Sequence, residues 1–101
     1  MSAFTFYNQS DVSCLPDTID RLEKAIAKQR PDLSAWFTQT KAAHVDTRLA
    51  TNADMVIVLD TLVRGLQRAG AGPVIKSTLS MKACPTAYMT AVRLGTIMPD
   101  Q

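Results

Sequence analysis

Few side chains in this sequence are suited to acid–base, nucleophilic or metal chemistry. His44 is the one histidine among the 101 residues, and Asp46 is its nearest carboxylate in the sequence. No serine or cysteine beside them forms a recognisable nucleophile–base pair, so we expect a surface histidine and not a general base. One histidine and two cysteines are also too few for a Cys/His zinc site within one subunit. These observations predict no catalytic residue, no metal and no cofactor, and they make an enzyme the least supported class.

The two cysteines, Cys14 and Cys84, lie far apart, and neither belongs to a CxxC pattern. We interpret them as half-buried structural thiols in a reducing compartment. A disulfide between them is the alternative, because only the fold decides whether they meet.

The segment 70–78, GAGPVIKST, contains the residue types of a phosphate-binding loop. In that motif a glycine directly precedes the lysine, so that backbone amides can surround the phosphate, and a strand precedes the loop. Here Ile75 precedes Lys76, and the residues before Gly70 have helical periodicity. We therefore expect no nucleotide site.

The longest apolar run, Met55 to Leu59, is five residues long. A transmembrane helix needs about 18 or more. The first residues, Met1 to Phe6, lack the basic start and the apolar region of a secretory signal. We expect no membrane span and a cytoplasmic location.

The helical spacing of apolar residues and the positions of proline and glycine predict an all-α fold. We expect a small compact bundle of four or five short helices that forms a single domain over residues 1–101. Pro16 suits the first turn of a helix that continues to about Lys28. Pro31 marks the start of a second helix, which carries Trp36 and Phe37 on one face.

The remaining elements surround a central helix, expected over about 52–69. Thr51 to Asp54 has the form of a capping box, and apolar residues then recur at helical spacing. We expect the N-terminal half of this helix to be surrounded by the others, with Leu22, Trp36, Phe37 and Tyr88 packed against the helix. Short helices are expected at 73–80 and 85–93. Residues 1–14 are expected to form an extended arm whose aromatic side chains pack on the body.

Charge is unevenly distributed along the chain. Residues 1–60 hold eight acidic and six basic residues. Residues 61–99, which we call the basic segment, hold no acidic residue and five basic ones: Arg64, Arg68, Lys76, Lys82 and Arg93. Such asymmetry favours an acidic partner, of which nucleic acid is the commonest, whereas the alternative is a set of solvated helix ends.

One hypothesis for the basic segment is a degenerate helix-turn-helix at about 73–93, in a DNA-binding regulator. The helix at 85–93 would lie in the major groove, and bases and phosphates would be contacted by Thr86, Thr90 and Arg93 together with Lys76 and Lys82. Against it, the turn at 81–84 has no glycine, and Ser77 and Thr78 occupy positions where the motif prefers apolar and small residues.

The hypothesis that we place first is a non-enzymatic regulatory or protein-interaction module that acts stoichiometrically. Three of the five methionines, Met81, Met89 and Met98, lie in the basic segment. An apolar patch of flexible thioethers rimmed by Lys and Arg suits an acidic protein surface or self-association as a dimer. Both hypotheses assign partner binding to the same residues: Arg64, Arg68, Lys76, Lys82, Thr86, Thr90 and Arg93.

Overall fold

The computed structural model describes residues 13–44 and 52–98. These ranges contain five α-helices and no strand: α2 (Leu15–Gln29), α3 (Ser34–His44), α4 (Asn52–Arg68), α5 (Gly72–Thr78) and α6 (Pro85–Arg93), with a 3-10 turn, η2 (Pro31–Leu33). The predicted all-α bundle is confirmed. Residues 1–12, most of the expected N-terminal arm, and Thr51 of the expected capping box lie outside the described residues.

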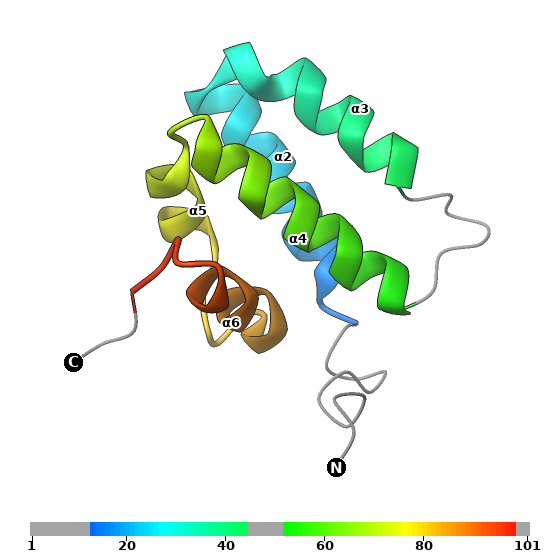
Figure 1. The fold of residues 1–101 in the computed structure, drawn as a ribbon, viewed down its shortest axis with the longest axis vertical. Helices are drawn as coiled ribbons and strands as arrows, with labels where there is room; N and C mark the ends of the chain where they lie inside the picture. Colours follow the sequence, from blue (N-terminus) through cyan, green and yellow to red (C-terminus); the bar gives the residue numbers. More distant parts are fainter. Residues whose placement is uncertain (1–12, 45–51, 99–101) are drawn as a thin grey trace.

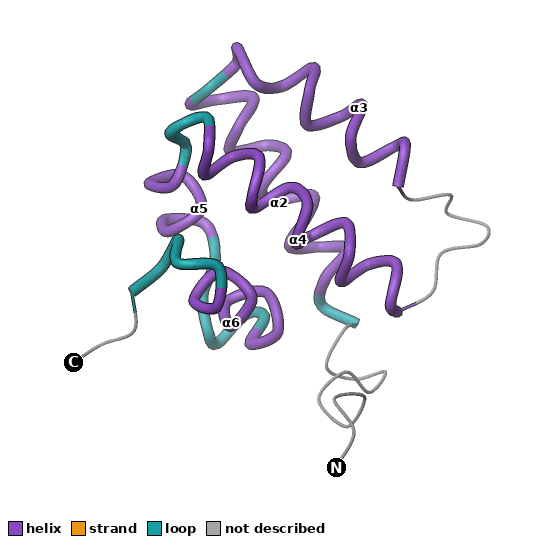
Figure 2. Tube along the Cα trace, in the orientation of Figure 1, coloured by secondary structure: helices purple, strands orange, loops and turns teal. Residues whose placement is uncertain are grey.

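The α4 helix occupies the centre of the bundle, as predicted, and contacts each of the other four helices. Figure 1 shows α3 on one side of α4 and α5 and α6 on the other, with α2 behind. In Figure 2, α3 and α4 run roughly antiparallel to each other.

Proline and glycine set the helix boundaries. Pro16, Pro73 and Pro85 each lie in the first turn of a helix, where a backbone N–H has no intrahelical acceptor to lose. Gly70 follows α4 and Gly95 follows α6, both with positive φ. After α4, Ala71 N–H donates to Leu66 O and Gly70 N–H to Gln67 O, the pattern of a Schellman motif. The α6 helix, which begins at Pro85 and ends before Gly95, has its predicted bounds of 85–93.

The core is formed by apolar faces at helical spacing. In α4, five side chains are fully buried: Val58, Leu59, Leu62, Val63 and Leu66. They meet a matching stripe on α2: Leu15, Ile19, Leu22 and Ile26. Phe37 of α3 is also fully buried, while Trp36 and Tyr88 are half-buried against this core.

The N-terminal half of α4 is not surrounded as expected. Ile57 is 55% exposed, and Met55 and Val56 are half-buried. Consecutive helical residues point about 100° apart, so the helix can turn Val58 and Leu59 inward only by turning Ile57 outward. None of the described residues covers that outer face.

Cys14 and Cys84 are joined by a disulfide, with Cα atoms 5.6 Å apart. Cys14 immediately precedes α2 and Cys84 immediately precedes α6, and these two helices contact each other. The interpretation of the cysteines as free thiols is therefore wrong. The fold brings together two helix starts that are 70 residues apart in the sequence.

No helix in the described ranges combines the length and the apolar character needed to cross a bilayer.

Candidate partner-binding surface

The five basic residues of the basic segment are all exposed, but they lie on different elements. Arg64 and Arg68 are one turn apart in the C-terminal half of α4. Lys76 lies on α5, Lys82 lies in the turn before α6, and Arg93 is the last residue of α6.

Asp60 joins two of these basic residues. Its carboxylate accepts hydrogen bonds from Arg64 Nε and, at 3.1 Å, from Arg93 Nη2. The second bond links α4 to α6. Partial burial acts to raise the pKa of Asp60, but the hydrogen bonds from Arg64 and Arg93 outweigh it and hold this pKa below its usual value.

Asp60 is not among the residues predicted to bind a partner, because it lies one residue before the basic segment. The i,i+4 spacing of Asp60 and Arg64 could have indicated their pairing, since such residues are neighbours on a helix. Nothing in the sequence indicated that Arg93 pairs with Asp60, because the two residues are 33 positions apart. Among the described residues no ion pair involves Arg68, Lys76 or Lys82.

Thr90 faces the core instead of solvent. It is 2% exposed, and its hydroxyl donates to Thr86 O of the preceding turn at 2.8 Å. Thr90 shares a buried stripe with Ala87 and Ala91, at i, i+3 and i+4 spacing, and this spacing was visible in the sequence. Thr90 is therefore not part of the exposed surface, and Thr86 is half-buried.

The two helices expected for the helix-turn-helix are present, but α5 and α6 each contact α2 and α4 more than they contact each other. In a helix-turn-helix, a short turn joins two helices, of which the second lies in the major groove while the first crosses the DNA backbone. Here α5 and α6 are attached separately to the same two helices.

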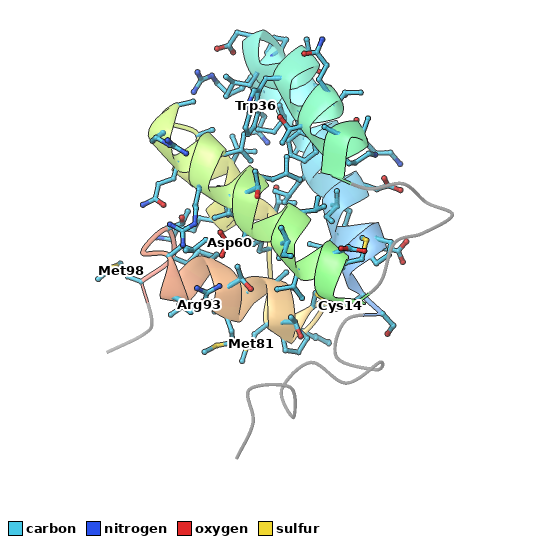
Figure 3. The ribbon with its side chains drawn as sticks, turned by 45° about the vertical axis from the view of Figure 1, so that its right-hand side comes forward. Cys14, Trp36, Asp60, Met81, Arg93 and Met98 are labelled. Atoms are coloured by element: carbon cyan, nitrogen blue, oxygen red, sulfur yellow. A yellow bond between two sulfur atoms is a disulfide. The ribbon has the colours of Figure 1, made fainter. Side chains whose placement is uncertain are left out.

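The described structure exposes four large apolar side chains, and three of them belong to the basic segment. Met81 is 49% exposed, Met89 50% and Met98 70%, while the fourth is Ile57. Met89 and Arg93 are one turn apart on α6, and Lys82 directly follows Met81. Figure 3 places Met81, Arg93 and Met98 around α6. We call these five residues, Met81, Lys82, Met89, Arg93 and Met98, the methionine surface.

The described residues contain no group of His, Cys, Asp and Glu side chains that could hold a metal ion, and neither cysteine there is free. His44 is the last residue of α3. The strongest chemical features of the described structure are thus exposed apolar and basic side chains.

Comparison of the chain with protein families, with curated proteins and with solved structures found no match.

Proposed function

We propose that this chain is a small non-enzymatic interaction protein that binds an acidic protein surface through the methionine surface. The observation that carries the proposal is that three of the four exposed large apolar side chains of the described structure, Met81, Met89 and Met98, lie on α6 or within five residues of its ends. Methionine is flexible and polarisable, so it adapts to varied partner shapes.

The basic rim selects the charge of the partner. Lys82 and Arg93 are exposed beside the methionines, and the Arg93 side chain remains 53% exposed although it contacts Asp60. An apolar centre with a charged rim is the arrangement of many protein interfaces, and the rim steers a partner of opposite charge toward the site.

An acidic partner is favoured over a second copy of the chain. In a two-fold dimer the same patch meets itself, so Lys82 and Arg93 of one copy would approach the same residues of the other. Juxtaposed like charges disfavour such a pairing. Acidic residues on the partner avoid this repulsion and supply ion pairs.

The alternative proposal, a DNA-binding regulator, has weaker support. Exposed Arg68, Lys76 and Lys82 favour it, since phosphate contacts need available cations. The burial of Thr90 removes one of the side chains expected to contact a duplex.

The disulfide bears on location. Disulfides persist in oxidising compartments and are rare in the cytosol. We therefore favour an oxidising compartment over the cytoplasmic location expected from the sequence, and this can be tested from the redox state of Cys14 and Cys84 in the native cell.

The proposed function can be tested by fluorescence anisotropy with two labelled probes, an amphipathic helical peptide of leucine and glutamate and a random DNA duplex. We expect peptide binding that the double substitution Met81→Gln/Met89→Gln weakens about tenfold or more. Ile57→Gln, which removes the exposed apolar side chain outside the methionine surface, should leave binding unchanged.

The DNA probe separates the two proposals. Phosphate contacts make affinity fall steeply between about 50 and about 200 mM salt, with a log–log slope of about minus one for each contact. Duplex binding with this slope, unaffected by the methionine substitutions, would favour the DNA proposal. Absence of peptide binding would overturn the proposal of an acidic protein partner.

A further inference from the structure

A cleft of about 550 Å³ lies between α3 and α4, and it shares no residue with the methionine surface. Its apolar walls are Leu33, Trp36 and Ala69. Thr40 and Thr61 add polar groups, and Arg68 adds a positive charge. Pockets of 300 to about 1,000 Å³ with apolar walls and a few polar groups are typical small-molecule sites.

The aromatic wall is fixed by a close approach of α3 to α4. A Cβ atom added at Gly65 would lie 2.3 Å from Trp36 Cζ2, so the indole packs directly on the backbone of α4. On the inner side, the Trp36 ring meets the buried Phe37 ring edge to face, with centroids 6.4 Å apart. Figure 3 shows Trp36 at the junction of these helices. Trp36 is half-buried, and the part of the ring that remains accessible offers apolar surface to a ligand.

The charge of the cleft is positive and available. Arg68 is exposed and forms no ion pair with another described residue. By contrast, Arg30, which donates to Ala69 O at the edge of the cleft, is already paired with Asp32 at 2.9 Å. Arg68 is thus the guanidinium that can pair with an incoming anion.

We propose that this cleft binds a small aromatic carboxylate. The aromatic body packs against Trp36, Leu33 and Ala69, and the carboxylate pairs with the planar donors of Arg68, which match its geometry. The site lies outside the methionine surface and does not depend on the proposed protein interaction.

The test is an NMR titration of the ¹⁵N-labelled protein with 2-naphthoate. Trp36 is the one tryptophan, so its indole N–H gives a single resonance within the proposed site. We expect a saturable shift of this resonance. The neutral analogue 2-naphthamide and the variant Arg68→Gln should each bind about tenfold more weakly, the loss expected for one charge-assisted hydrogen bond. Arg68→Lys keeps the positive charge but lacks the planar donors of arginine, so its affinity for naphthoate should be intermediate.

Two matched controls localise the effect. Lys82→Gln removes a positive charge from the methionine surface and should leave naphthoate binding unchanged. Methionine methyl resonances should not follow the titration. The proposal is overturned if the Trp36 resonance does not move up to about 10 mM naphthoate, if naphthamide binds equally well, if Arg68→Gln has no effect, or if the methionine methyls shift in place of Trp36.

Discussion

Gly65 is a helical residue at which the usual effect of alanine should be reversed. Alanine in place of glycine inside a helix is favourable by up to about 1 kcal/mol. Here the added Cβ would lie 2.3 Å from the Trp36 ring, so the ring must leave its place on α4. Overpacking of this kind costs about 1 to 3 kcal/mol. We expect Gly65→Ala to lower the free energy of unfolding by about 1 kcal/mol in urea titrations and to shift Trp36 emission to the red.

A double-mutant cycle isolates the cause. When Trp36 is replaced by alanine, the space above Gly65 is empty, and Gly65→Ala should then stabilise the helix by its propensity gain. A stabilising Gly65→Ala in the otherwise unchanged protein, with unaltered tryptophan emission, would show that the ring does not rest on Gly65.

Asp60 makes stability depend on pH. The hydrogen bonds from Arg64 and Arg93 lower its pKa in the folded protein despite partial burial. The Glu23 pKa is also lowered, by hydrogen bonds from Lys41 and Thr38 of α3. A carboxyl with a lowered pKa binds protons more weakly when folded than when unfolded, so acid favours the unfolded chain. These contributions are complete above the unfolded pKa values, and they are lost below about pH 4 as the pH falls through the folded values.

The variant Asp60→Asn tests this dependence. Its loss of stability should be full at pH 7 and smaller at about pH 3, because below the unfolded pKa of about 4 the unfolded carboxyl takes up a proton. Urea midpoints at the two pH values provide the measurement. An equal loss at both would mean that the carboxylate charge of Asp60 does not contribute.

At the scale of elements, local signals were sufficient to locate the helices. Pro85 and Gly95 bracket α6, and the first turns of α2 and α5 contain Pro16 and Pro73. These signals act within one turn, so they can be read from neighbouring residues. Contacts such as Cys14–Cys84 and Asp60–Arg93 depend on how helices pack, and no local pattern encodes them.

The disulfide fixes the start of α2 to the start of α6. It closes a loop with a sequence separation of 70. In the chain-entropy treatment a loop of this length stabilises the folded state by about 4 kcal/mol. We expect the variant Cys14→Ala/Cys84→Ala to unfold at a clearly lower urea concentration than the oxidised protein.

Reduction of the unsubstituted protein is the matched comparison, because it opens the same loop without changing any side-chain volume apart from the thiols. Reduced protein should unfold near the midpoint of the double variant. Equal midpoints with and without reductant would show that the two cysteines are not paired in the folded protein.

For the whole molecule, the central position of α4 predicts a single cooperative transition. Every other described helix packs on α4, so none of them retains its core when α4 is lost. Leu62 is fully buried in this helix, and Leu62→Ala should cost about 2 to 5 kcal/mol with an unchanged urea m-value.

Ile57→Ala is the control on the same helix. Because Ile57 is 55% exposed, its truncation should change stability by about 0.5 kcal/mol or less. Two separate transitions, or a loss below about 1 kcal/mol for Leu62→Ala, would contradict the central role of α4.

The disulfide also changes the covalent topology of the chain. Residues 14–84 form a closed macrocycle, and α6 is attached outside it. Hydrolysis of one peptide bond anywhere inside the ring leaves a single molecule that has gained one water, and it separates into two fragments only after reduction. Hydrolysis of the bond just after Cys84, by contrast, leaves α6 with Met89, Arg93 and Met98 held by packing alone to a ring that still contains α2 to α5. Most of the methionine surface and the Trp36 cleft would then belong to separate covalent units without any reduction of the disulfide.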